Sequence, residues 1–73
     1  MRVTPGLYRH FKGTLYRVSG VARHSETDEW LVIYHPEGRP DELWVRPAAM
    51  WNERVRRDGY DGPRFTPETA GNP

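Results

Sequence analysis

The stretch ARHSETDEW, residues 22–30, sets a histidine, a serine and acidic residues almost side by side. These are the residue types of a nucleophilic triad, which needs a base oriented by a third group and a prepared oxyanion site. Neighbours in an extended chain point to opposite faces, so His24 and Ser25 do not meet if the strand continues. No strained elbow or glycine-rich oxyanion loop flanks Ser25. The stretch therefore predicts a hairpin turn whose polar side chains bond nearby backbone, and we assign no catalytic residue.

Metal binding is the second chemistry to consider, because the chain contains His10, His24 and His35. Their spacing matches no compact ligand motif, and the chain has no cysteine to supply a thiolate. A hairpin around residues 12–13 places His10 and His24 at opposite ends of a strand about 25 Å long. We expect three separate, partly exposed histidines, no metal site and no cofactor.

Length and composition limit the function classes. At 73 residues the chain is expected to form one domain, near the size at which a single core only just suffices. The absence of cysteine suits a reducing compartment, and neither a signal peptide nor a membrane-spanning run is evident. We therefore expect a cytoplasmic protein. The net charge of +1 and pI of about 8.2 are too near neutral to indicate nucleic acid by charge alone.

Alternating apolar and polar residues, punctuated by glycine and proline, predict a chain of short strands. Residues 7–12 and 14–18 alternate on either side of Lys12-Gly13, which is a hairpin signal. The second strand continues to His24, and Ser19-Gly20 within it is typical of a bulge or bend. Further strands are predicted at residues 30–35 and 43–47.

The chain after Pro47 predicts less regular structure. One helical turn is expected near Pro47–Trp51, because AAMWNE is too short for more. Residues 54–65 predict a strand, turns at Asp58-Gly59 and Asp61-Gly62, and a last extended piece. We expect a single domain over residues 1–65 and a disordered tail over 66–73. The fold class is mostly β, a small antiparallel SH3-like barrel or roll, with the SH3-like comparison made by analogy.

The strands also predict which side chains reach a ligand. In residues 43–46 the apolar pair Leu43 and Val45 is expected to face the core, leaving Trp44 and Arg46 outward to stack on a flat ligand or hold an anion. The same rule turns Leu31 and Ile33 inward and Trp30, Val32 and Tyr34 outward. The alternative is that the helical turn or the tail covers these aromatic rings. The basic run Arg54, Arg56 and Arg57 is interpreted as a solvated face rather than a phosphate site.

Three pieces of the chain are similar to a known family. RHFKG (residues 9–13), ARHSET (22–27) and WVRPAAMW (44–51) resemble the bacterial domain-of-unknown-function family 1653, over residues 5–65. The resemblance implies a small SH3-like barrel and brings no reaction, ligand or catalytic residue. Trp30 stands where the family pattern is polar, which argues against Trp30 as part of a shared site.

Because the polar residues of these motifs are not those a core requires, binding or loop fixation explains them. We favour a non-catalytic binding module for a protein, peptide or small polar ligand, with no membrane partner. The alternative is single-stranded nucleic-acid binding by stacking in a basic groove, and a small hydrolase is the weakest reading. The candidate ligand-binding residues are His10, Lys12, His24, Tyr34, Trp44 and Arg46.

Overall fold

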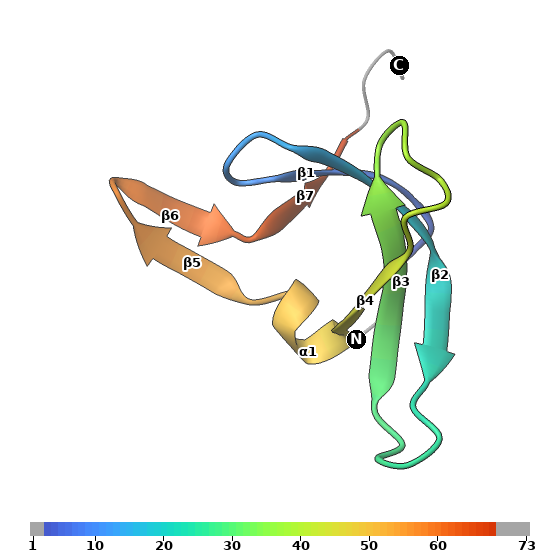
Figure 1. Ribbon diagram of the computed structural model, residues 1–73. Coiled ribbons are helices and arrows are strands. Elements are labelled where there is room, and N and C mark those ends of the chain that lie inside the picture. The colour runs from blue at the N-terminus through green and yellow to red at the C-terminus, as the bar shows by residue number, and fades with distance from the viewer. Residues whose placement is uncertain (1–2, 69–73) are drawn as a thin grey trace.

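Five antiparallel strands form one curved sheet in the spatial order β4-β3-β2-β1-β7, and two more form a separate hairpin, β5-β6 (Figure 1). The computed structural model describes residues 3–68. Its elements are β1 (Gly6–His10), β2 (Leu15–Arg23), β3 (Trp30–Pro36), β4 (Trp44–Pro47), α1 (Ala48–Trp51), β5 (Arg54–Arg57), β6 (Tyr60–Pro63) and β7 (Phe65–Pro67). The predicted mostly-β class and the short helical turn are confirmed.

The β1-β2 hairpin forms where the sequence predicts it. The amide of His10 donates to the carbonyl of Thr14 at 2.8 Å, and the amide of Gly13 donates to the carbonyl of His10 at 2.7 Å. Gly13 has a φ of 108°, which a side chain rarely allows. The pairing of β2 with β3 shifts register between Val18 and Gly20, so the predicted bulge is also confirmed. A bulge there bends the long β2 and lets the sheet coil.

The β5-β6 hairpin reverses on two residues. Asp58 and Gly59 both have positive φ, 53° and 81°, as a type I′ turn requires. The second predicted turn, at Asp61-Gly62, is wrong because both residues pair with β5 as part of β6. The first turn has already reversed the chain, so the next residues extend. A Cβ at Gly62 would lie 2.7 Å from the Tyr60 hydroxyl oxygen, so any larger residue there requires the Tyr60 side chain to move.

The core lies on the concave face of the sheet, and α1 packs against it. Trp51 of α1 is 2% exposed, and its indole stacks on Phe65 of β7 with ring centroids 3.7 Å apart. Tyr34 of β3 meets the same indole edge-on at 4.9 Å. The buried residues of this cluster are Val3, Tyr8, Val18, Val32, Tyr34, Ala48, Trp51 and Phe65.

The predicted inward face of β3 is wrong. Val32 and Tyr34 are buried, at 0% and 5% exposure, whereas Leu31 and Ile33 are only half-buried. The prediction that Trp30 is exposed holds, at 47%. The inner face is the one that α1 covers. This agrees with the alternative stated above, in which the helical turn covers the aromatic rings.

The error continues in β4, because cross-strand pairs share a face. Tyr34 pairs with Trp44 and Val32 with Arg46. Trp44 and Arg46 therefore lie on the inner side of the sheet, and the pair predicted to face the core, Leu43 and Val45, is 59% and 61% exposed.

The chain remains in the sheet beyond residue 65, where the predicted domain ends. Thr66 and Pro67 belong to β7, and the amide of Glu68 donates to the carbonyl of Leu7 at 2.8 Å. The rest of the predicted tail, residues 69–73, lies outside the described residues. Within residues 3–68 the sheet keeps two edges, β4 and β7, so it is a roll rather than a closed barrel. No helix in this part of the chain has the length and apolarity to cross a membrane.

Candidate functional site

His10 ends β1 among aromatic rings contributed by the adjacent turn, by β2 and by β7. Its ring centroid lies 4.6 Å from that of Phe11, 5.0 Å from Phe65 and 6.3 Å from Tyr16. Tyr16 in turn contacts Trp44 at 5.9 Å, and Trp44 remains 41% exposed. The sheet thus carries a continuous row of rings from the β1-β2 turn to the edge strand β4.

Two arginines bring buried donors to the same region. The guanidinium of Arg46 lies 5.7 Å from the centre of the Phe65 ring, and its Nε is buried with no hydrogen-bond partner. The Nε of Arg64 is likewise buried and unpartnered, although its Nη2 donates to Glu53 at 3.0 Å. A buried N–H without an acceptor is costly, and such groups are few in native proteins. Both atoms are therefore donors whose hydrogen bonds are not made within the described residues, and a small movement of either side chain would offer them to a ligand acceptor.

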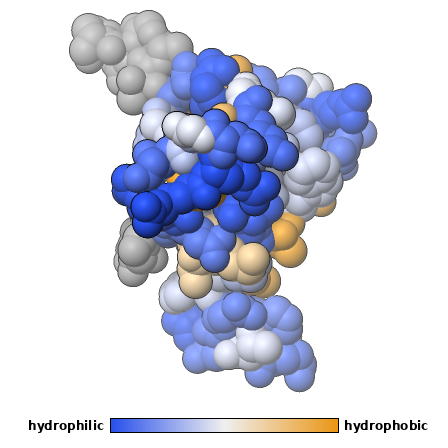
Figure 2. Space-filling view, turned by 90° about the vertical axis from the view of Figure 1, so that its left-hand side faces the viewer, coloured by the Kyte–Doolittle hydropathy of each residue, from blue (hydrophilic) through white to orange (hydrophobic). Residues whose placement is uncertain are grey.

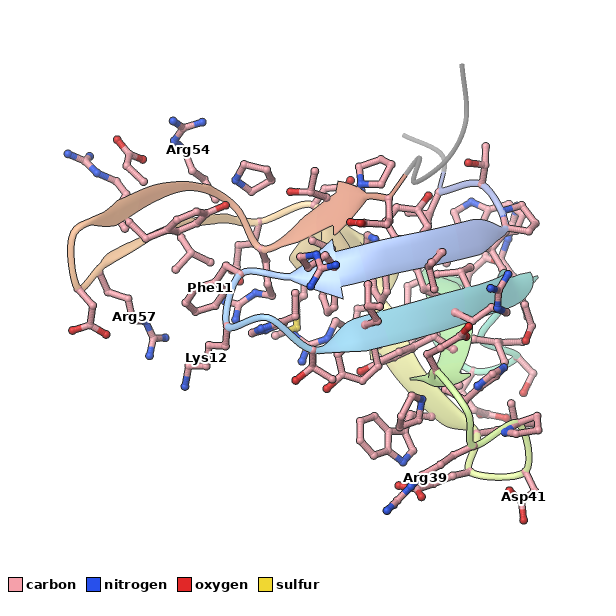
Figure 3. The ribbon with its side chains drawn as sticks, turned by 90° about the horizontal axis from the view of Figure 1, so that it is seen from above. Phe11, Lys12, Arg39, Asp41, Arg54 and Arg57 are labelled. Atoms are coloured by element: carbon pink, nitrogen blue, oxygen red, sulfur yellow. The ribbon has the colours of Figure 1, made fainter. Side chains whose placement is uncertain are left out.

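The cations that lack a carboxylate partner also gather here. Ten of the eleven lysines and arginines lie within residues 3–68, and seven of the ten form salt bridges. The three without a salt bridge in that part of the chain are Lys12, Arg46 and Arg57. Lys12 and Arg57 lie over the Phe11 ring, at 6.0 and 5.8 Å. Figure 3 shows Phe11, Lys12 and Arg57 together at one end of the molecule.

The surroundings of His10 lower its pKa. Burial has the largest effect, followed by the positive charges of Arg64, Arg46, Lys12 and Arg57. The Nδ1 atom accepts a hydrogen bond from the backbone N–H of Lys12 at 3.1 Å. The neutral ring therefore carries its proton on Nε2, which is a donor. His10, Arg46 and Arg64 thus present N–H donors in a region of positive potential.

Five of the six candidate residues lie in or beside this row of rings. His10, Lys12, Trp44 and Arg46 have accessible or unpaired polar groups, whereas Tyr34 is buried beneath Trp44, 5.8 Å from its ring. Tyr34 therefore supports Trp44. The sixth, His24, lies at the opposite end of β2, beside the turn to β3 (Figure 1).

His24 has a structural task in that turn. Its Nδ1 accepts from the amides of Glu26 and Thr27, at 3.0 and 3.3 Å. His24 and Glu29 face each other across this turn without an ion pair between their side chains. Their contact is a backbone hydrogen bond of 2.8 Å, and the Glu29 carboxylate accepts from the Thr27 hydroxyl instead. The turn predicted for the ARHSETDEW stretch is confirmed.

Four residues near His10 were missed by sequence reasoning: Phe11, Arg57, Arg64 and Phe65. Arg57 belongs to the basic run interpreted as solvated. Its neighbours Arg54 and Arg56 fit that interpretation, since both pair with Asp61. Figure 2 shows this end of the molecule as strongly hydrophilic. No local pattern marks Arg64 or Phe65, because β7 reaches β1 only through the folded chain.

The histidines are well separated along the sheet. His10 and His24 flank opposite ends of the β1-β2-β3 meander, and the ring Nδ1 of His35 lies 2.8 Å from the carbonyl of Pro36. Within residues 3–68 no group of three or more potential ligands stands close enough to hold a metal ion. That the histidines bind no metal remains a prediction.

The fold and this surface define a small mostly-β roll that presents a cationic, aromatic face. The chain belongs to the family described as protein of unknown function DUF1653, whose match covers residues 6–67. A crystal structure of a DUF1653 protein from Bordetella bronchiseptica is 39% identical, with a TM-score of 0.74, and the match covers 90% of this chain and 95% of that one. The resemblance deduced from the sequence is therefore confirmed. No curated protein matches the chain.

Proposed function

We propose that this protein is a non-catalytic binding module that recognises a negatively charged group. The site, which we call the His10 surface, consists of His10, Phe11, Lys12, Trp44, Arg46, Arg57 and Arg64. The observation that carries the proposal is where the cations without a salt bridge lie. All three cations without a salt bridge in residues 3–68 lie around one histidine.

Like charges held together repel one another, so a cluster without counter-charges lowers stability unless something else favours it. An anionic ligand supplies the missing charge. It also supplies acceptors for the buried Nε atoms of Arg46 and Arg64. Exposed rings beside the cations, chiefly Trp44, add a surface for stacking.

Several features support binding rather than catalysis. The His10 ring accepts from a backbone amide, and every charge that shifts its pKa is positive. A general base of the triad type needs a carboxylate or similar group to orient it. His24 is held in the far turn, where its Nδ1 accepts from two backbone amides, and Ser25 lies in the same turn. We include in the proposal an SH3-like class for the roll and a cytoplasmic setting, the latter supported by the cysteine-free sequence.

The experiment is calorimetric titration with inorganic phosphate at constant ionic strength. Lys12→Ala and Arg57→Ala should each weaken binding about fivefold, because each removes one charge near the ligand. The matched control is Arg39→Ala. Arg39 is also exposed, pairs with Glu42, and lies apart from Phe11, Lys12 and Arg57 in Figure 3. Equal weakening by all three substitutions would contradict a localised site.

Single-stranded nucleic acid is a second candidate ligand, favoured by the half-exposed Trp44 on the same face of β4 as the unpaired Arg46. A labelled oligothymidylate should then bind with an affinity that falls steeply with salt. Trp44→Ala should weaken that binding by at least tenfold through loss of stacking. If the oligonucleotide does not bind even at low salt, this alternative is excluded, and the proposal of an anion-binding module still stands.

A further inference from the structure

We propose that the His10 surface is a proton-coupled site for a phosphate group, in which His10 takes up a proton as a phosphate monoester binds. This inference rests on the proposed function and adds the class of ligand and its control by pH. The observations behind it are the number of unpaired charges, the orphaned donors and the exclusively cationic surroundings of the histidine.

The count of charges favours a dianion. Lys12, Arg46 and Arg57 contribute three positive charges without salt-bridge partners in residues 3–68. A carboxylate neutralises one of them, whereas a phosphate monoester near neutral pH carries between one and a half and two negative charges, as a rough guide. Phosphate also has three terminal oxygens, which suits several donors that different strands place about His10 and the Phe65 ring.

The donors come from four separate parts of the chain. Arg46 reaches in from β4, Arg64 from between β6 and β7, and His10 from the end of β1. Glu53 occupies only the Nη2 atom of Arg64, so the buried Nε–H has no acceptor within the described residues. Lys12 approaches from the β1-β2 turn. A terminal phosphate oxygen accepts readily from each of these N–H groups.

A bound dianion reverses the sign of the electrostatic potential at His10, and this couples ligand binding to the uptake of a proton. The charged groups that face His10 are Arg64, Arg46 from β4, Lys12 from the β1-β2 turn and Arg57 from β5, and the adjoining elements β2 and β7 contribute the Tyr16 and Phe65 rings. All four charges are positive, so the empty site favours neutral imidazole. A bound dianion outweighs them locally and favours imidazolium. By linkage, a ligand that raises the pKa of His10 must bind more tightly as pH falls.

Sulfate is the first probe, because it remains a dianion throughout the range from pH 7.5 to 5.5, whereas phosphate titrates near pH 6 itself. Ring carbon–proton spectra of His10 should report a pKa that rises by about one unit on saturation with sulfate. The affinity for sulfate should then increase about fivefold between pH 7.5 and 5.5, because the tenfold limit of a one-unit rise is reached only below both pKa values. The ring signals of His24 serve as an internal reference and should not move with sulfate.

His10→Gln tests the proton directly, because an amide keeps a donor near the position of Nε2 but does not titrate. This variant should still bind sulfate, with an affinity that no longer changes with pH. A comparison of the affinities for methyl phosphate and for acetate at pH 7.5 tests the ligand class. Methyl phosphate should bind at least tenfold more tightly than acetate.

Each remaining outcome has one meaning. Sulfate binding that is equal at both pH values, or that changes with pH as strongly in His10→Gln, overturns the proton coupling and leaves the anion-binding module standing. Acetate binding as tight as methyl phosphate overturns the phosphate class alone. Failure of sulfate, methyl phosphate and acetate to bind overturns this inference and the proposed function together.

Discussion

The indole of Trp51 lies flat on the ring of Phe65, with centroids 3.7 Å apart and planes inclined by 4°. This contact joins α1 to β7, two elements that have no backbone pairing with each other. Phe65 also contacts His10 and Arg46. The ring that anchors the core is therefore the ring on which the candidate site rests, so core packing positions the binding groups.

Trp51→Ala should remove this anchor. Truncating a fully buried tryptophan costs about 3–5 kcal/mol, which approaches the whole free energy of unfolding expected for so small a domain. Far-ultraviolet circular dichroism in a urea series should show a protein that is largely unfolded at 25 °C. Trp30→Ala is the matched control, because Trp30 is 47% exposed, and it should cost below about 1.5 kcal/mol. Equal losses would contradict the packing.

The β2-β3 turn should depend on His24 rather than on Ser25. His24 accepts two backbone amides, and the hydrogen bonds of the turn within the described chain do not involve the Ser25 hydroxyl. His24→Ala should therefore cost about 1 kcal/mol of unfolding free energy, whereas Ser25→Ala should cost below about 0.5 kcal/mol. Urea denaturation of the two variants measures the difference, and a larger loss for Ser25→Ala would be contrary to the observed bonding.

Protonation of His10 should destabilise the fold. Its pKa is lowered in the folded state, chiefly by burial, so the unfolded chain binds the proton more readily. The resulting stability is fully present above the unfolded pKa of about 6.5 and is lost as pH falls through the lower folded value. The depressed pKa values of Glu37 and Glu68 cause further losses only below about 4.5.

Melting temperatures at pH 7.5 and 5.0 test this dependence on pH. The wild type should lose stability across that interval by more than His10→Gln does. A difference between the two proteins that stays constant from pH 7.5 to 5.0 would show that His10 does not titrate as described.

The corrected face of β4 gives a further prediction. Val45 is 61% exposed and Val32 is fully buried, although both are valines in the middle of a strand. Val45→Lys should change the free energy of unfolding by about 0.5 kcal/mol or less, whereas Val32→Lys should unfold the protein by burying an unpaired charge. Chemical denaturation measures both. Severe destabilisation by Val45→Lys would instead support the prediction from the sequence, in which Val45 faces the core.

The sequence predicted the strands well because glycine, proline and period-two alternation act locally. It failed on the face of β3 because both faces of that strand carry apolar residues, and the error passes to β4 because paired residues share a face. Val32 and Tyr34 compete with Leu31 and Ile33, and hydrophobicity alone does not rank the pairs. The choice is made by Trp51, which lies beyond β4 and covers the side carrying Tyr34.

The candidate site was predictable only where its residues stand in short local motifs. His10, Lys12 and Arg46 stand out within short motifs, and the structure places them in one region. Arg64 joins them because β7 pairs with β1, a contact between distant parts of the chain that no local pattern reports. His24 was grouped with them by its residue type, whereas its hydrogen bonds belong to the turn.

The most direct test of the proposed site is the nitrogen–proton spectrum of arginine side chains during titration with methyl phosphate at pH 6.5. The Nε–H signals of Arg46 and Arg64, both buried and unpartnered, should shift together and saturate with one dissociation constant. The Nε–H signal of Arg39, on an exposed side chain paired with Glu42, should stay in place. Stationary Arg46 and Arg64 signals, or a drift shared equally with Arg39, would contradict a phosphate site at His10.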